Sequence, residues 1–191
     1  MSRVLVRGLR AAVLAFALSL AGLVGSAHAT TVLAVDVVDQ AVEADALIEA
    51  IVGDSRVVRG ERVPFTETEL SVVRVLGGDA PASLVLRQVG GEIDGVTTVI
   101  AGDAKLVKGQ RVAAFVAQTD GKWHLVALAQ SVWHIEGEGP KAPVYRDLGD
   151  SNFMERDHAG AVVPAMQSPR EYANYGELLA DARGLTFGGA R

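Results

Sequence analysis

Apolar and polar residues alternate along much of the middle of the chain, which is the pattern of β-strands with one buried face. The clearest alternation runs over residues 62–76. Its two faces hold Thr66, Thr68, Leu70 and Val72 on one side and Glu67, Glu69 and Ser71 on the other. The pattern breaks at Val73-Arg74-Val75, which predicts a β-bulge or a strand end buried on both faces. Further strands are predicted over residues 46–58, 83–89, 96–100 and 131–135, with a short edge strand at 144–146.

The dipeptide Asp120-Gly121 is the strongest turn signal, because a two-residue type I′ turn needs positive φ at both positions. Apolar β-forming residues flank it on both sides, so a hairpin is predicted there. Its expected pairs are Thr119 with Lys122, Gln118 with Trp123, Ala117 with His124 and Phe115 with Val126.

Two helices are predicted, one near each end. Asp36 can cap a helix of about two turns over residues 36–44, although the β-branched valines there leave a strand as the alternative. Near the C-terminus, Ser168, Pro169 and Glu171 supply an N-cap, a first-turn proline and a capping-box glutamate. This pattern predicts a helix over residues 169–183 that ends at Gly184, followed by a tail over residues 185–191.

About seven strands joined mostly by tight turns favour a mainly β fold. We expect an OB-like barrel, closed or partly open, with a short N-terminal helix and a C-terminal helix; a β-sandwich is the alternative. The expected organisation is a signal peptide (1–29), a barrel domain (30–139), an irregular linker (140–167), the C-terminal helix (168–184) and the tail.

The N-terminal segment has the features of a secretory signal. Arg3, Arg7 and Arg10 precede an apolar run over residues 11–25, and Ala27-His28-Ala29 fits a cleavage site before Thr30. An uncleaved membrane anchor is the alternative, but the run is shorter than the ~20 residues a spanning helix needs. The sequence therefore predicts a periplasmic or secreted protein with no membrane span after cleavage.

Charge and cysteine content narrow the function classes. Without residues 1–29 the chain has 15 basic and 23 acidic residues, a net charge of −8, which argues against nucleic acid as a partner. The chain contains no cysteine, which excludes disulfides, thiolate metal sites and cysteine nucleophiles.

Three segments carry a distant resemblance to known proteins: Ala44-Asp45-Ala46-Leu47-Ile48, residues 66–77, and Gly109-Gln110-Arg111-Val112. In spacing and hydrophobicity, residues 36–135 resemble uncharacterised exported bacterial OB-like barrel proteins. They are also distantly similar to the netrin-type module of tissue inhibitors of metalloproteinases. The resemblance implies an OB-like barrel and a protein-binding role. Those inhibitors act through an N-terminal cysteine, which this chain lacks, so their mechanism does not carry over.

The two tryptophans suggest a binding surface. If a hairpin turned near Leu128-Ala129, Trp123 would oppose His134 and His124 would oppose Trp133, forming an aromatic patch for a small ligand or a partner. Ordinary packing is the alternative interpretation.

The alternating residues His134, Glu136 and Glu138 could hold a divalent cation, although Gly137 and Gly139 equally suit a solvated acidic linker. Residues 90–95 lack the features of a phosphate-binding loop and are expected to form a mobile loop at the barrel mouth. No nucleophile elbow or zinc-protease motif is present.

We therefore expect an exported, non-enzymatic binding or interaction module of the bacterial envelope or extracellular space, without a cofactor. Its expected partner is an envelope or secreted protein. The alternative is a metal- or small-ligand-dependent protein, including a hydrolase.

Overall fold

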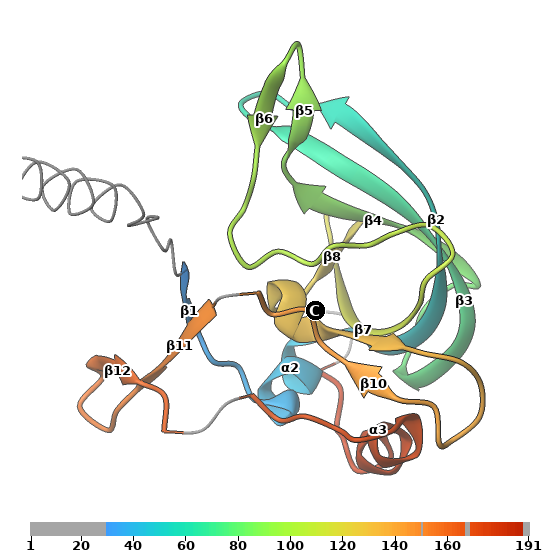
Figure 1. The fold of residues 1–191 in the computed structure, drawn as a ribbon, viewed down its shortest axis with the longest axis vertical. Helices are drawn as coiled ribbons and strands as arrows, with labels where there is room; N and C mark the ends of the chain where they lie inside the picture. The colour runs from blue at the N-terminus through green and yellow to red at the C-terminus, as the bar shows by residue number, and fades with distance from the viewer. Residues whose placement is uncertain (1–29, 150, 167–168, 189–191) are drawn as a thin grey trace, which may run out of the picture.

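The structure is a computed structural model that describes residues 30–149, 151–166 and 169–188. Five strands form a ring in the order β2, β3, β4, β8, β7 and back to β2 (Figure 1). Their bounds are Ala46–Arg59 (β2), Pro64–Gly78 (β3), Ser83–Val89 (β4), Arg111–Thr119 (β7) and Lys122–Leu125 (β8). The predicted signal peptide lies outside the described residues.

Neighbouring strands of the ring are antiparallel except β4 and β8, which are parallel and joined by the single pair Leu86 and Trp123. The contact between β4 and β8 therefore has the fewest paired residues of any two neighbouring strands in the ring. The mainly β fold predicted from the sequence is confirmed: the structure has a ringed sheet of five strands and a helix near each end.

The two longest strands, β2 and β3, curve around the ring. Three residues of β3, Glu69, Val73 and Leu76, have no partner in β2, and the register shifts at each of these points. The bulge predicted near Val73 is thus confirmed. Bulges increase the local bend and twist of a strand, which helps a small sheet to close on itself.

The predicted β7–β8 hairpin is confirmed with its register: Thr119 pairs with Lys122 and Gln118 with Trp123. Asp120 and Gly121 have φ values of 50° and 71°, as a type I′ turn requires. The backbone N–H of Val126 donates to the carbonyl of Phe115, so the hairpin continues as predicted beyond the last ladder pair.

Helix α2 (Val37–Glu43) begins after Asp36, whose side chain accepts from the N–H of Val38, as predicted. Helix α3 (Tyr175–Ala182) is shorter than the predicted helix over 169–183. Its N-cap is Asn174, whose side chain accepts from the N–H of Glu177, and the carboxylate of Glu177 accepts from the N–H of Ala173. The predicted N-cap, Ser168, lies outside the described residues.

A buried arginine explains the later start of α3. Arg146 donates to the carboxylate of Glu171 and to the carbonyl of Arg170, so the predicted first turn of the helix is held in another conformation.

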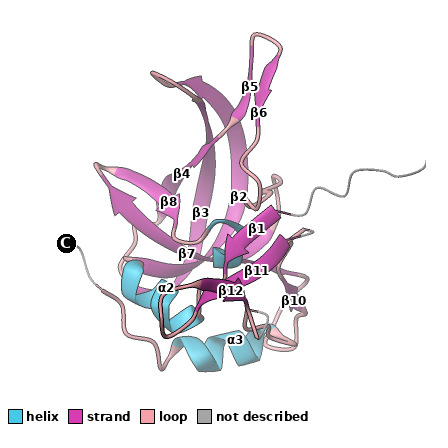
Figure 2. Ribbon diagram, turned by 90° about the vertical axis from the view of Figure 1, so that its left-hand side faces the viewer, coloured by secondary structure: helices cyan, strands magenta, loops and turns pink. Residues whose placement is uncertain are grey.

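The segment 140–167, expected to be irregular, contains three short strands: β10 (Val144–Tyr145), β11 (Ser151–Arg156) and β12 (Val162–Pro164). β11 pairs in parallel with β1 (Thr30–Leu33), and the small sheet β1-β11-β12 lies beside the ring (Figure 2). The sequence pattern missed it because its partner strand lies at the other end of the chain.

The remaining elements surround the ring. The hairpin of β5 (Gly91–Ile93) and β6 (Val96–Thr98) projects from one end, away from both helices (Figures 1 and 2). A 3₁₀ turn (Leu128–Ser131) precedes β9 (Val132–Ile135), which pairs with β7 and β10. No helix in the described part of the chain is long and apolar enough to cross a membrane.

The alternation along β7 separates two hydrophobic cores. Val112, Ala114 and Val116 belong to the core inside the ring, with inward residues of the other four ring strands. Ala113 and Phe115 belong to an outer core, where α2, α3 and the C-terminal segment cover the outer face of the sheet. The helices therefore leave the end near β5 and β6 uncovered (Figure 1).

Candidate functional site

The sequence-predicted tryptophan and histidine pairs do not form one exposed surface. Trp133 is 1% exposed and packs in the outer core edge-on to Phe115, beneath the guanidinium of Arg146. His134 is also buried and stacks on Tyr145. The side chains at 123 and 124 are half-buried. Trp123, alone of these four, packs against the core inside the ring and lines a second groove, of about 610 Å³, along β3, β4 and β8.

The predicted opposition of Trp123 and His134 is wrong. Both β8 and β9 pair with the same strand, β7, but at successive positions: β8 with residues 116–119 and β9 with residues 112–114. The two strands therefore lie one after the other, with the 3₁₀ turn between them, rather than face to face. Trp123 pairs with Gln118, and His134 pairs with Val112 and Tyr145.

The predicted metal ligands are not brought together either. His134 is inside the fold, and burial lowers its pKa, partly opposed by the negative charge of Asp147. Glu136 and Glu138 are exposed in the turn beyond β9. Among residues 30–149, 151–166 and 169–188, no group of three or more histidine, aspartate or glutamate side chains could hold a metal ion.

A different feature stands out inside the ring, where the inward side chains change from aliphatic to polar at one end. Along β3, Leu70 faces the inner core, while Thr68 and Thr66 follow at inward positions. The same change occurs in β4 after Leu86 and in β2 after Val52. The polar residues at this end are Ser55, Thr66, Thr68 and Gln88, which we call the polar layer.

The polar layer forms one wall of a groove of about 530 Å³ at the mouth of the ring. The other walls are the base of the β5–β6 hairpin, the connection over residues 97–106, and residues 147–149 with Ser151. The glycine-rich segment 90–95, expected at the mouth as a mobile loop, lies there and forms most of the hairpin.

Hydrogen bonds join the polar layer to these walls. The hydroxyls of Ser55 and Thr68 lie 2.9 Å apart, and Thr66 Oγ1 donates to the carbonyl of Gly90 at 3.0 Å. Gln88 Nε2 donates to Asp103 Oδ1 at 2.8 Å and to the carbonyl of Ala104 at 2.9 Å. The groove is thus held by side chains of the ring itself, which makes it a largely preformed site.

Asp103 is the most unusual group in the groove. Burial raises the pKa of its carboxyl, and the hydrogen bonds from Gln88 and from the N–H of Ala104 only partly oppose this. No arginine, lysine or histidine of the described chain forms an ion pair with it. Binding and catalytic sites often contain a half-buried carboxyl in a groove with both apolar and polar lining residues, as here.

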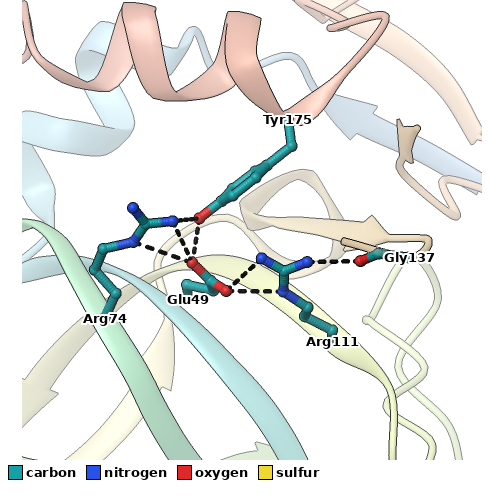
Figure 3. A network of polar contacts seen from close by, with 5 residues as sticks. All are labelled: Glu49, Arg74, Arg111, Gly137 and Tyr175. Atoms are coloured by element: carbon teal, nitrogen blue, oxygen red, sulfur yellow. Dashed lines mark hydrogen bonds and ion pairs between the residues drawn. The ribbon is translucent and has the colours of Figure 1, made fainter. Parts of the chain in front are cut away.

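A second polar cluster lies on the outer face of the ring, beneath α3 (Figure 3). Glu49 Oε2 accepts from Arg74 and from the hydroxyl of Tyr175, while Glu49 Oε1 accepts from Arg111. Arg111 also donates to the carbonyl of Gly137 at 2.6 Å. Glu49 is 2% exposed and has partners on both oxygens, so this cluster fastens α3 to the sheet rather than offering a ligand site.

Sequence reasoning missed the groove, although part of its signal was visible. The shared face of Thr66, Thr68 and Leu70 is evident from the alternation, but Asp103 lies in a connection without periodicity. Comparison of the chain with protein families, curated proteins and solved structures finds no match.

Proposed function

We propose that this protein is an exported, non-enzymatic binding module of the bacterial envelope or extracellular space, and that its ligand occupies the groove at the mouth of the ring. The observation that carries the proposal is the polar layer. A small ring of strands normally fills its interior with apolar side chains, so a level of inward hydroxyl and amide groups beside an open groove favours a ligand.

Binding is favoured over hydrolysis by the partners of these groups. The hydroxyls of Ser55, Thr66 and Thr68 bond to one another or to a backbone carbonyl, and no histidine is among the residues that line the groove. An activated hydroxyl nucleophile needs an adjacent base, which this arrangement does not supply.

The proposed export rests on the N-terminal sequence, and the fold is compatible with it. The described residues of strand β1, Thr30–Leu33, all lie after the predicted cleavage site, so cleavage would retain their pairing with β11. Intact-mass measurement of the protein recovered from periplasm or medium should give a chain that begins at Thr30. A secreted or periplasmic chain that retains Met1 would contradict the proposed cleavage.

The ligand site can be tested by recording amide chemical shifts of the ¹⁵N-labelled protein against a panel of polyols, amino acids, organic acids and amines. We expect at least one class to shift amides of residues 88–91 and 97–106. Thr68→Val, which removes one hydroxyl at nearly constant volume, should weaken that binding. Thr119→Val, an exposed strand threonine outside the groove, is the matched control. Shifts confined to other surfaces, or none at all, would refute the proposal.

A protein partner is the second candidate, and the exposed valines beside the groove favour it. Val96 and Val99 are 68% and 77% exposed on and after the projecting β6 strand. Such exposed apolar side chains are typical of contact surfaces. The double variant Val96→Thr/Val99→Thr should no longer capture a partner. The control is Val162→Thr on β12, where the valine is 50% exposed, and this variant should still capture it. Equal capture by all three proteins would refute this candidate.

A further inference from the structure

We propose that the groove at the mouth of the ring selects a small organic cation with several N–H donors, and that Asp103 receives its ammonium group. This inference rests on the proposed function and names the class of ligand.

The first argument is the balance of donors and acceptors in the groove. Both hydrogens of Gln88 Nε2 are used, one on Asp103 Oδ1 and one on the carbonyl of Ala104. The hydroxyl hydrogens of Thr66 and Ser151 are used on the carbonyls of Gly90 and Leu148. Their oxygens keep free lone pairs, so these fixed groups offer a ligand mainly acceptors. A ligand that matches them must bring donors.

The second argument is the charge of the lining. Three carboxylates line the groove, from Glu92, Asp103 and Asp147, against the single cation of Lys105. Lys105 Nζ lies 3.6 Å from Asp147 Oδ2, so it is directed to that residue. The remaining charge is negative, which opposes an anionic ligand and favours a cation.

The third argument is Asp103 itself. Its Oδ1 accepts two hydrogen bonds, whereas Oδ2 accepts none from the described residues. Its raised pKa reflects a partly buried carboxylate without a countercharge. Such a carboxylate is stabilised by a cation placed against it, because an ion pair away from bulk water is strong.

An organic cation suits the site better than a metal ion or a flat aromatic ligand. Among the described residues, no three carboxylates or histidines lie close enough together to hold a metal ion, the three carboxylates of the groove included, and about 530 Å³ is far more than a single ion needs. No aromatic residue is among those that line the groove, so stacking of a nucleobase or a sugar ring has no platform there.

The test is a titration of the full-length protein with 1,4-diaminobutane, followed by calorimetry and by amide shifts, with 1,4-butanediol as the neutral counterpart. We expect the diamine to bind in the groove and the diol to bind at least roughly tenfold more weakly. Asp103→Asn should reduce diamine affinity by about tenfold, while Asp79→Asn, an exposed carboxyl outside the groove, should leave it unchanged.

A second variant protects the test against a folding defect in Asp103→Asn. Lys105 is 80% exposed, so Lys105→Gln should fold normally and, by removing the only cation of the lining, increase diamine affinity severalfold. Diamine affinity that is unaltered in both folded variants would overturn the assignment.

The outcomes separate this inference from the proposed function. Binding of a polyol or an organic acid in the groove without diamine binding would overturn the cation inference and leave the binding proposal standing. Calcium that binds there and displaces the diamine would show that the groove takes a metal ion, which would overturn the proposal of an organic cation. If no compound shifts the groove amides, both the inference and the proposed function fail.

Discussion

Two glutamates on the outer face of the ring are each held by two arginines, but their surroundings differ. Glu49 receives Arg74 and Arg111 and also the hydroxyl of Tyr175 from α3 (Figure 3). Glu67 receives Arg56 and Arg87 from the strands on either side of its own, and no helix of the described residues donates a hydrogen bond to its side chain. The same chemistry therefore joins distant parts of the chain in one place and only neighbouring strands in the other.

Solvent exposure indicates what each cluster contributes. The arginines at Glu49 are 20% (Arg111) and 50% (Arg74) exposed, and those at Glu67 are 29% (Arg87) and 75% (Arg56) exposed, so water competes more at Glu67. Exposed ion pairs contribute about 0–1 kcal/mol, whereas removing one member of a buried cluster leaves uncompensated charge. The comparison teaches that the number of ion pairs predicts stability poorly unless burial and connectivity are known. The following predictions test this difference.

The largest effect is expected for Glu49→Gln. This change leaves two arginines beneath α3 without a countercharge, so the free energy of unfolding should fall by about 3 kcal/mol. Urea unfolding measures the loss, and amide exchange of residues 175–182 should show that α3 is released first. A loss no larger than that of Glu67→Gln would contradict the assigned role.

Tyr175→Phe should have the next largest effect. It keeps the aromatic ring, which packs in the outer core. The guanidinium of Arg111 lies 5.0 Å from the centre of this aromatic ring. It removes the hydroxyl that bonds to Glu49 and Arg74, which should cost about 1–2 kcal/mol in urea unfolding. The matched control is Tyr145→Phe, because Tyr145 is 43% exposed. Its expected loss in free energy of unfolding is near zero.

The next effect concerns the dependence of stability on acid pH. For Glu49, burial raises the pKa, but hydrogen bonds from Tyr175, Arg74 and Arg111 prevail and lower it below 4.5; for Glu67, hydrogen bonds from Arg87 and Arg56 lower it. A carboxyl with a lowered pKa in the folded state stabilises the fold above pH 4.5, and this contribution disappears as the pH falls below it. Between pH 7 and pH 3, the free energy of unfolding measured in urea should fall less for Glu49→Gln than for the unmodified protein. Parallel curves would contradict this.

The smallest effect is expected for Glu67→Gln. Because Arg56 is mostly exposed and Arg87 is partly exposed, water can reach both guanidinium groups when the charge is removed, and the free energy of unfolding should fall by less than about 1 kcal/mol at pH 7. High salt should reduce the difference from the unmodified protein further. A loss as large as that of Glu49→Gln would show that connectivity to a helix is not the deciding factor.

Local patterns predicted the parts of the fold that local physics determines. The Asp120-Gly121 turn, the N-cap at Asp36 and the bulge near Val73 depend on residues close in sequence, and all three are present. The start of α3 was predicted wrongly because a buried arginine from another segment, Arg146, holds Glu171.

The candidate site was harder to predict for the same reason. Whether Trp133 is exposed depends on α3 and the C-terminal segment, which cover β9, and this cover has no signature within β9 itself. The groove depends on residues from β2, β3, β4 and two connections that meet only in the folded ring. Only the inward threonines of β3 were visible beforehand.

The parallel pairing of β1 with β11 has a consequence for the order of folding. Thr30 pairs with Ser151, and Gln130 bonds both to the carbonyl of Leu33 and to the N–H of Val35. The first described strand to leave the ribosome therefore finds its partner only after about 120 further residues have been made. The ring can form from segments that are closer together along the chain, so we expect the N-terminal strand to join last. For the export that we propose, this order would help to keep the chain unfolded until it has crossed a membrane, because the described N-terminal strand gains its partner late.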